Sequence, residues 1–509
     1  MQQSLHRNGL ELLTFPNELL VEILGHLSWR NILVVRRTCK LLFDVSKSRA
    51  IWVSLFLRFS REGTVPPVLD RPLKRYTVAE LENIVLKRIS SEVRWAHSEK
   101  PHEWKFRAQY PSDEDCVLLL DGGRWLLAMF QENAKWGRVY VYDLDGKACP
   151  KIIISLGIEG RMDQFNSWHM DADRDLNNDD SSLSFTLCLT STYRPADDLG
   201  RDSGSDRPVN GVYIYRLTVK GQGHNAVLKA HKLKHLRDSQ LATDDCLVYS
   251  VALRGEYLVR YRNPPNPGSI MEQFYTFEVY NWALSNNSVH YKACVDGIHR
   301  IQLDDNPLLL RDGKLLVFSS PVVSVYDIAN LEPSPIGAVD IPTLESYWQF
   351  TDFSHSHQVH FSRPYRDSLA SRVSVVLDNH VFGFTIPHDI QKNPSWQQLS
   401  ESIFPPDELL YCVGINKIYF FEESQLGNGK GTVKTEGLLW DKGEGDKGCF
   451  LSELPLDLPV KHLSQRQFEP PLRPWYDDVA PLFDESSNRI VTFSNKSWIL
   501  LDFAYRQPQ

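Results

Sequence analysis

The sequence is poor in cysteine and contains no dense cysteine motif. Its eight cysteines stand at positions 39, 116, 149, 188, 246, 294, 412 and 449 of the 509 residues. A zinc knuckle needs closely spaced ligand pairs, and a small secreted scaffold needs a framework of neighbouring disulfides. The wide spacing excludes both patterns. We therefore predict that these cysteines are buried thiols.

Long hydrophobic runs and a signal segment are missing as well. The first residues do not read as a basic segment followed by an apolar one, and no run reaches the length of a membrane helix. The net charge is −8 and the isoelectric point is about 6.1, without a basic patch interleaved with aromatics. We therefore expect a protein of the cytoplasm or the nucleus, with no membrane and no nucleic-acid partner.

Patterns that carry catalysis or hold a metal are also lacking. Asp171, Asp173 and Asp175 have the alternating spacing of a calcium loop, but Leu176 stands where the loop needs glycine. The run at 427–432 resembles a phosphate loop, yet no helix is expected after it, so it is predicted to be a hairpin turn. His355, His357 and His360 do not all share one strand face. We expect no catalytic residue, no metal site and no cofactor.

What the sequence does contain is a strongly periodic apolar segment near its start. Pro16 suits the first position of a helix, and Glu18 lies in the first turn, where the helix dipole favours an anion. The apolar residues that follow are spaced by three and four and form two adjacent columns: Leu19, Leu20, Ile23, Leu24 and Leu27. This pattern predicts an amphipathic helix with one face for packing.

Further short helices follow with almost no connector. Ser28 can cap a second helix that carries Leu33, a third contains Cys39 and Leu42, and Trp52 comes next. Residues 13–59 hold seven basic side chains against three acidic ones, a net charge of +4 in a chain of net charge −8. So small a unit buries little apolar surface alone. We therefore expect it to dock onto an acidic helical partner.

This segment resembles the F-box. The resemblance rests on the order and spacing of Leu13, Pro16, Glu18, Leu19, Leu20, Ile23, Leu24, Leu27, Ile32, Leu33, Cys39, Lys40, Leu42 and Trp52. It implies a small all-α domain that binds an acidic Skp-type adaptor and, through it, a cullin scaffold. The residues that it implies for partner binding are Pro16, Leu19, Leu20, Ile23, Leu24, Leu27, Leu33, Cys39, Leu42 and Trp52, with Pro16, Leu20 and Leu24 expected to be the main anchor.

An amphipathic helix is predicted in the connecting segment. Thr77 and Glu80 have the spacing of a capping box, in which each side chain caps the backbone N–H of the other residue. The apolar stripe that follows contains Leu81, Val85 and Ile89 and should pack on either the F-box or the body beyond. We interpret this helix as a rigid spacer.

From about residue 110 the apolar period changes from helical to alternating. The strand pair in residues 121–145 is echoed by the pair in residues 311–328. Five more aromatic-rich segments read as the equivalent second strand: 212–218, 274–282, 380–386, 417–423 and 497–503. Short repeated sheets can bury both faces by stacking radially, so we predict a β-propeller of about seven blades. A double β-sandwich is the competing architecture.

Together these observations predict a multidomain α+β protein with three parts: an F-box domain at residues 10–60, a linker with an amphipathic helix at 61–110 and a β-propeller-like target-binding domain at 111–509. The resemblance implies a non-catalytic substrate adaptor of a Skp–cullin–F-box ubiquitin ligase, with a target protein that the sequence does not name. The alternatives are a non-degradative interaction scaffold and a propeller enzyme. The helical and β parts are expected to act independently.

Overall fold

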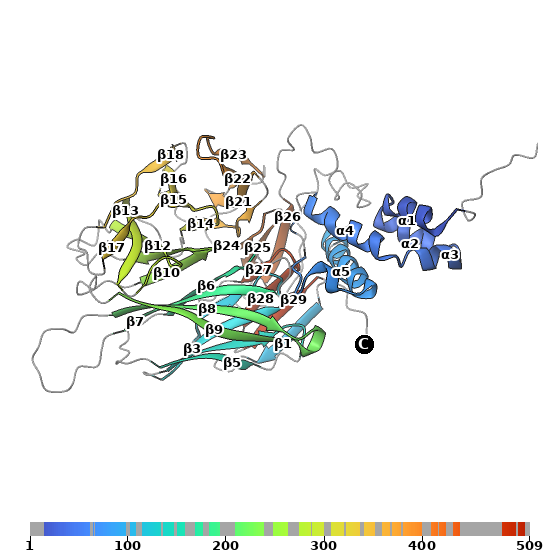
Figure 1. Ribbon diagram of the computed structural model, residues 1–509, viewed down its shortest axis with the longest axis horizontal. Coiled ribbons are helices and arrows are strands. Elements are labelled where there is room, and N and C mark those ends of the chain that lie inside the picture. Colours follow the sequence, from blue (N-terminus) through green and yellow to red (C-terminus); the bar gives the residue numbers. More distant parts are fainter. Residues whose placement is uncertain are drawn as a thin grey trace, which may run out of the picture.

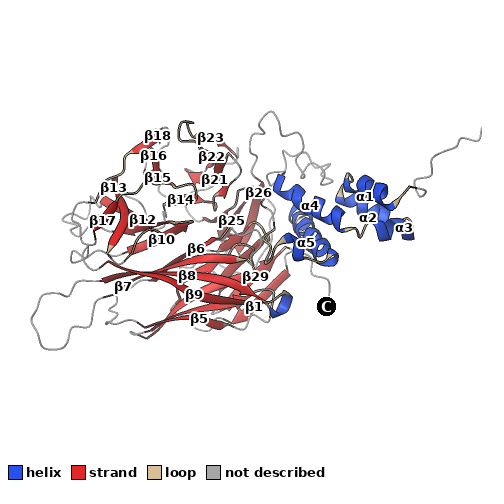
Figure 2. Cartoon of the chain, in the orientation of Figure 1, coloured by secondary structure: helices blue, strands red, loops and turns tan. Residues whose placement is uncertain are grey.

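A computed structural model of the chain shows a group of helices beside a larger body of strands (Figures 1 and 2). The described residues are 15–61, 65, 67–97, 102–107, 114–133, 136–146, 150–157, 168–176, 183–193, 209–238, 248–262, 274–286, 288–299, 307–319, 322–335, 341–351, 359–366, 369–377, 380–399, 409–415, 417–423, 431–437, 481–494 and 497–503.

The N-terminal part is helical. Its elements are α1 (Asn17–Gly25), α2 (Trp29–Arg36), α3 (Lys40–Val45), α4 (Arg49–Arg61), the 3-10 turn η2 (Leu73–Arg75) and α5 (Val78–His97). Among the described helices, none is long and apolar enough to cross a membrane.

The helices begin where the local sequence signals predicted. Pro16 precedes α1, and Glu18 lies in its first turn. The Ser28 hydroxyl accepts a hydrogen bond from the Asn31 N–H at 3.3 Å, which caps α2. The Thr77 N–H donates to the Glu80 carboxylate at 2.8 Å, and the Glu80 N–H donates to the Thr77 hydroxyl at 3.3 Å. The predicted capping box is therefore confirmed.

The rest of the described chain is made mainly of strands, which form seven antiparallel sheets. Strands are given in their order across each sheet. The first sheet contains β2 (Glu114–Leu119), β3 (Trp125–Asn133), β4 (Trp136–Asp143) and β5 (Lys151–Gly157). The second contains β6 (Trp168–Arg174), β7 (Ser184–Tyr193), β8 (Val209–Lys220) and β9 (Val227–Asp238), and the third contains β10 (Val248–Arg254), β11 (Tyr257–Arg262), β12 (Phe274–Asn281), β13 (Val289–His299) and β17 (Pro333–Pro335).

The next three sheets follow along the chain. They are β14 (Leu308–Leu310), β15 (Lys314–Ser319), β16 (Val322–Asp327) and β18 (Ser346–Phe350); β19 (His360–Phe361), β21 (Ala370–Leu377), β22 (His380–Pro387) and β23 (Ser395–Gln398), with β20 (Tyr365–Arg366) also on β21; and β24 (Leu409–Val413), β25 (Lys417–Glu423) and β26 (Gly431–Gly437). β25 and β26 pair antiparallel, as a hairpin at this place requires. Of the turn predicted at 427–432, residues 427–430 lie outside the described residues, and Gly431 and Thr432 belong to β26.

The last sheet closes the ring. It contains β27 (Leu482–Asp484), β28 (Arg489–Ser494) and β29 (Ser497–Asp502), and β29 pairs with β1 (His102–Arg107) from the other end of the domain. β1 falls within the range predicted as linker, so the all-β domain includes residues ahead of the expected boundary at 111. The backbone hydrogen bonds between β1 and β29 thus join the two ends of the domain and close the ring of sheets.

The hydrophobic core is divided among neighbouring sheets. Along β3, Leu126 and Ala128 pack toward the sheet of β29, while Leu127 and Met129 pack toward the sheet of β6. Further apolar clusters join the β6 sheet to the β10 sheet, the β10 sheet to the β14 sheet, and the β14 sheet to the β19 sheet. The sheets of β2, β6, β10 and β14 thus each bury both faces against their neighbours, as in a propeller. The competing double β-sandwich is wrong.

The seven sequence segments proposed as equivalent strands are all strands, and each lies in a different sheet. They correspond to β4, β8, β12, β16, β22, β25 and β29. Six sheets have four or five described strands each and form full blades, and the seventh has three. The expectation of about seven blades is therefore close to the six full blades of the described residues. The predicted architecture, a small helical domain followed by a large all-β propeller, is confirmed.

Candidate functional site

The helical domain has its own hydrophobic core, and several predicted partner-binding residues belong to it. Leu20 is 1% exposed and Leu24 is 3% exposed, and both pack with Trp52. The Trp52 indole N–H donates to the Ser46 carbonyl at 2.9 Å. Leu42 is buried in the same cluster. These side chains hold the domain together before any partner binds.

The outer surface of α1 is formed by the other apolar column. Leu19 is 52% exposed, and Ile23 one turn later is also exposed, as is Pro16 ahead of the helix. On α2, Val34 is 61% exposed. Solvent exposure of large aliphatic side chains costs free energy unless a partner covers them. Pro16, Leu19, Ile23 and Val34 are defined here as the outer apolar residues.

The ten residues predicted to bind the partner therefore divide by burial. Pro16, Leu19 and Ile23 are exposed; Leu27, Leu33 and Cys39 are half-buried; and Leu20, Leu24, Leu42 and Trp52 are buried. Their role in binding stays a prediction. The expected anchor needs revision in one respect: Leu20 and Leu24 can support docking only by supporting the fold. Sequence reasoning missed Val34, although its position on the polar side of α2 was readable from the 3.6-residue period.

Some basic side chains of the helical domain form hydrogen bonds and ion pairs within the domain. The Arg36 guanidinium donates to the Ser46 hydroxyl at 2.8 Å, pairs with Glu82 of α5 and lies 5.4 Å from the centre of the Trp52 ring. The Arg58 guanidinium donates to the Gly25 carbonyl at 3.3 Å. Arg37, Lys40 and Lys47 remain exposed to solvent. An acidic partner would meet these exposed cations, because Arg36 and Arg58 are bonded inside the domain.

The predicted spacer helix α5 packs against both parts of the protein. Its stripe of Leu81, Val85 and Ile89 is buried in the core of the helical domain. On the other side, the Arg88 guanidinium donates to the Glu485 carbonyl at 2.6 Å and to the Ser486 carbonyl at 3.3 Å in the turn between β27 and β28. Figure 1 shows α5 between α1–α3 and the strands. The helix is thus a fixed joint.

Two further contacts strengthen this joint. The Asn488 amide in the same turn donates to the Ser91 hydroxyl at 2.7 Å. Asn488 has φ 54°, a left-handed conformation that asparagine tolerates better than most residues. In the segment before η2, the Asp70 carbonyl accepts a hydrogen bond from the Leu183 N–H at 3.0 Å, and the Asp70 carboxylate lies 3.7 Å from Arg124. The helical domain is therefore attached to the propeller at two places.

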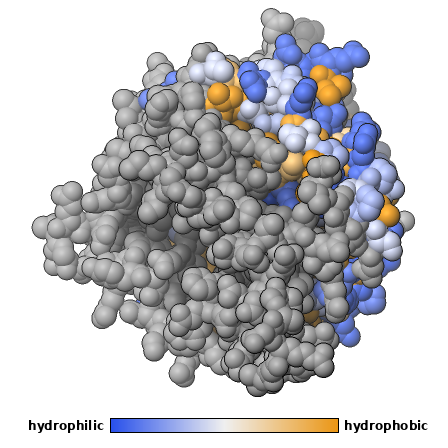
Figure 3. Space-filling view, turned by 90° about the vertical axis from the view of Figure 1, so that its left-hand side faces the viewer, coloured by the Kyte–Doolittle hydropathy of each residue, from blue (hydrophilic) through white to orange (hydrophobic). Residues whose placement is uncertain are grey.

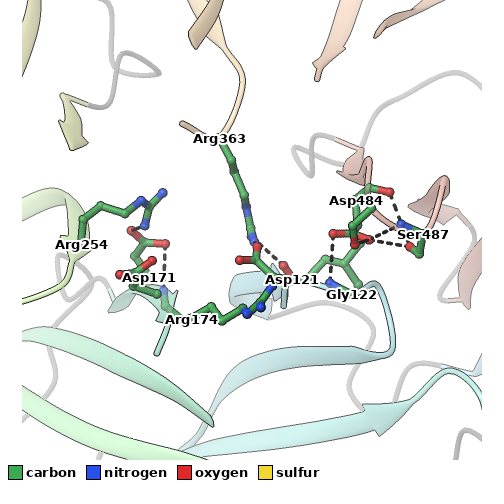
Figure 4. Close-up of polar contacts among 12 residues, drawn as sticks. Asp121, Gly122, Asp171, Arg174, Arg254, Arg363, Asp484 and Ser487 are labelled. Carbon is green, nitrogen blue, oxygen red and sulfur yellow. Dashed lines mark hydrogen bonds and ion pairs between the residues drawn. The ribbon is translucent and has the colours of Figure 1, made fainter. Parts of the chain in front are cut away.

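Charged side chains converge at the centre of the propeller, where the first strand of each sheet ends (Figure 4). We call them the central polar cluster; its members are Asp121, Asp171, Asp173, Arg174, Arg254, Arg311, Arg363 and Asp484. Arg254 binds Asp171 at 2.8 Å, and Arg311 binds Asp173 at 2.6 Å. Arg363 pairs with Asp121 across the cluster and also donates to the Leu119 carbonyl at 2.6 Å. These bonds fasten sheets that are distant in sequence.

The carboxylates of this cluster are held by backbone amides as well as by arginines. Asp171 accepts the Leu253 N–H at 2.8 Å, and Asp484 accepts the Gly122 N–H at 3.1 Å. Burial raises the pKa of Asp121, but the charges of Arg363 and Arg254 outweigh it and hold that pKa below its usual range. Asp171 and Asp173, which form part of the calcium-like spacing, are thus engaged in inter-sheet ion pairs. The convergence of carboxylates alone does not establish catalysis.

The side of the propeller that faces away from the helices has a mixed surface. Figure 3 shows hydrophobic residues scattered among hydrophilic ones over the described part of this face. Such single exposed apolar residues are normal for a protein surface and indicate no particular partner.

Comparison with known proteins supports the identity of the helical domain. The F-box-like family model matches residues 12–58. No curated protein matches the chain.

Among solved structures, a Trypanosoma rangeli sialidase in complex with sialic acid is 10% identical, with a TM-score of 0.33, and the match covers 66% of this chain and 58% of that one. Prolyl oligopeptidase B from Galerina marginata is 8% identical, with a TM-score of 0.27, and the match covers 70% of this chain and 51% of that one. The chain spans at most 60% of the length of the sialidase structures that it matches. Likeness this low says nothing about activity.

The helix starts, the shared apolar core and the family match agree with one another. The chain carries an F-box-like domain at residues 12–58, followed by a β-propeller.

Proposed function

We propose that this protein is the substrate-recognition subunit of a Skp–cullin–F-box ubiquitin ligase. The observation that carries the proposal is the F-box-like domain with its outer apolar residues, joined through α5 to a propeller. The outer apolar residues and the exposed Arg37, Lys40 and Lys47 suit an acidic Skp-type adaptor, which in turn would connect the chain to a cullin. The propeller would hold the target protein.

The mechanism of such a subunit is proximity. Holding a target lysine near a charged ubiquitin-conjugating enzyme raises its effective concentration, and this needs no catalytic residue in the receptor. The fixed joint at α5 supports this role, because a rigid connection keeps the target at a defined distance from the adaptor. The reaction itself would take place on other subunits, in the cytoplasm or the nucleus.

The proposal is tested in two ways. Binding to a purified Skp-type adaptor and a cullin is measured by reconstitution. In cells with the proteasome blocked, full-length protein is expressed and the captured proteins are assayed for attached ubiquitin. The variant Leu19→Asp with Ile23→Asp should lose the adaptor, because it places charges on exposed apolar positions of the docking surface. The same variant should still capture targets but leave them without ubiquitin. Leu369→Asp is the matched control, since Leu369 is an exposed leucine on the propeller.

Two results would contradict the proposal in different ways. If the Leu19→Asp, Ile23→Asp variant bound the adaptor at the original affinity, the F-box-like domain would not form the interface with the adaptor. Normal adaptor and target binding without any ubiquitin on the target would instead favour the non-degradative scaffold.

Deleting the whole F-box would be a poorer experiment. Leu81, Val85 and Ile89 lose their packing partners when the first helices are removed, because the stripe of α5 lies in the same core. A truncated chain would expose this stripe and could bind other proteins through it. The expectation that the two parts act independently therefore does not extend to their folding.

A further inference from the structure

The hairpin formed by β8 and β9 has an unusual charge. Residues 209–238 contain six basic residues, Arg216, Lys220, Lys229, Lys232, Lys234 and Arg237, and one acidic residue, Asp238. The net charge of this stretch is +5, in a chain whose net charge is −8. It is therefore a local basic region on an otherwise acidic protein, and it would attract acidic partners.

Register and exposure place much of this charge on one face. Arg216 is opposite His231 and Thr218 is opposite Lys229, so these side chains and that of Lys220 lie on the same face of the hairpin. Arg216, Lys220, Lys229 and His231 are exposed. Arg216 lies 3.5 Å from Asp175, whereas Lys220, Lys229 and His231 form no ion pair with the part of the chain that the structure describes.

The same hairpin presents a long strand edge. β9 is the last strand of its sheet, and within the described residues nothing pairs with its outer side. Residues 227–232 pair without interruption with β8, before the register shifts at Leu233. Leu228 is buried, and Ala230 packs against the core between two sheets. This half of the edge is consequently a straight ladder of backbone groups held by a packed inner face.

A third contact fixes the hairpin against the next sheet. The Lys234 ammonium donates to the carbonyls of Trp282 at 2.8 Å, Ala283 at 2.7 Å and Ser285 at 2.5 Å. Burial lowers the pKa of Lys234 from its ordinary value. Lys234 is thus structural, while Lys229, His231 and Lys232 remain available at the surface.

We propose that the outer edge of β9, over residues 227–232, binds an extended acidic segment of a target protein, which adds to the sheet as a further strand. The proposal rests on the proposed role of the propeller as a target receptor. Lysine on an edge strand disfavours pairing with most chains. The register puts Lys229 and Lys232 on opposite faces of β9. Carboxylates on both faces of the added segment, one beside Lys229 and one beside Lys232, would turn this repulsion into attraction, so the edge would select acidic segments.

The geometry favours a polypeptide over a nucleic acid as the occupant. An added strand satisfies the backbone N–H and C=O groups along the edge, which a phosphate backbone cannot do. Residues 227–232 include no Phe, Tyr or Trp on which a base could stack.

Binding is measured by fluorescence anisotropy with the full-length protein and no adaptor. The probe is a short fluorescein-labelled peptide of Glu with interspersed Val, which carries carboxylates on both faces of an extended strand. It should bind, and its binding should weaken as salt is raised. The variant Lys229→Glu with Lys232→Glu should lower the affinity at least about tenfold, because like charges would then face each other. The control variant Arg366→Glu with Lys392→Glu, which reverses two exposed cations on another sheet, should bind as the original protein does.

Strand addition is tested separately with modified probes. In an added strand every second N–H points to the sheet, so two peptides methylated on alternate nitrogens should differ: one should lose binding and the other should keep it. Equal binding of both would overturn strand addition. Binding of an oligothymidine as tight as that of the acidic peptide would overturn the assignment to a polypeptide. Lys229→Gln with Lys232→Gln, a milder change, should give an intermediate loss and guards against misfolding of the charge-reversed variant.

The anisotropy assay and the adaptor-binding test together separate the two proposals. If the acidic peptide does not bind but the adaptor does, the edge proposal is overturned and the ligase role is untouched. If the peptide binds but the adaptor does not, the ligase role is overturned and the binding of an acidic segment at the β9 edge stands.

Discussion

The joint at Arg88 offers the sharpest test of how the two parts of the molecule are connected. Arg88 is 4% exposed, and its guanidinium donates to the carbonyls of Glu485 and Ser486. The change Arg88→Met keeps the apolar stem and removes the charged donors. Hydrogen bonds from a charged group contribute about 1.5–3 kcal/mol. The Ser486 carbonyl would lose the Arg88 donor, while the Glu485 carbonyl would keep the Asn488 N–H at 3.3 Å. We therefore expect the free energy that holds α5 on the propeller to fall by about 1.5–3 kcal/mol.

The magnitude translates into a measurable opening. A loss of about 1.5–3 kcal/mol raises the population of the opened joint by roughly tenfold to a hundredfold. Hydrogen exchange followed by mass spectrometry should show faster exchange in α5 around Arg88 and in the turn between β27 and β28, with little change in the sheets far from the joint. Adaptor binding should be retained, while the rate of ubiquitin conjugation to a captured target should fall because its lysines are no longer held at one distance.

The matched control is Arg75→Met on the exposed turn η2, where the arginine has no hydrogen bond to the propeller in the described residues. It should leave exchange in α5 unchanged. Unchanged exchange in the Arg88→Met variant would refute the reasoning, because it would mean that the packing of α5 alone holds the joint.

Two further predictions concern stability. Leu24→Ala should destabilise the helical domain by about 2–5 kcal/mol through the cavity that it leaves, whereas Leu19→Ala, one helix face away, should change stability by less than about 0.5 kcal/mol; denaturation monitored by helical circular dichroism distinguishes them, and equal losses would contradict the burial assignment. The buried Arg489 lies 2.6 Å from Asp145, and although burial raises the pKa of Asp145, the charge of Arg489 outweighs it and holds that pKa well below its ordinary value. The pair's stabilisation should thus be present above about pH 4 and be lost as the pH falls further toward the depressed pKa. Urea midpoints at decreasing pH should drop more steeply below pH 4 for the original protein than for Asp145→Asn, and parallel curves would count against this role.

The sequence by itself determined the local elements of this protein. Pro16, Ser28 and Thr77 mark three helix starts because capping depends on residues a few positions apart. The alternating aromatic segments were found for the same reason, since strand periodicity is a local property. One such segment lies in each of the seven sheets that the described residues form. Radial stacking then followed from the need of short sheets to bury both faces.

Only the tertiary structure decided which of two equivalent columns on α1 faces inward. The sequence places Leu19 and Ile23 beside Leu20 and Leu24 in one apolar stripe, and either pair could have formed the core. The packing of α3 and α4 against the side of α1 that carries Leu20 and Leu24 made the choice. The prediction of the anchor was limited because partner-facing and core-facing leucines have the same period.

The connections between distant parts were also beyond the reach of the sequence. The hydrogen bonds from Arg88 span about 400 positions along the chain, and the pair of Arg363 with Asp121 spans 242. A charged residue at the end of a strand carries no local signal of which partner it will meet. Ring closure by β1 and β29 brings such residues together, and so it is the closed arrangement of the sheets, not any local pattern, that fixes the α5 joint and the central polar cluster.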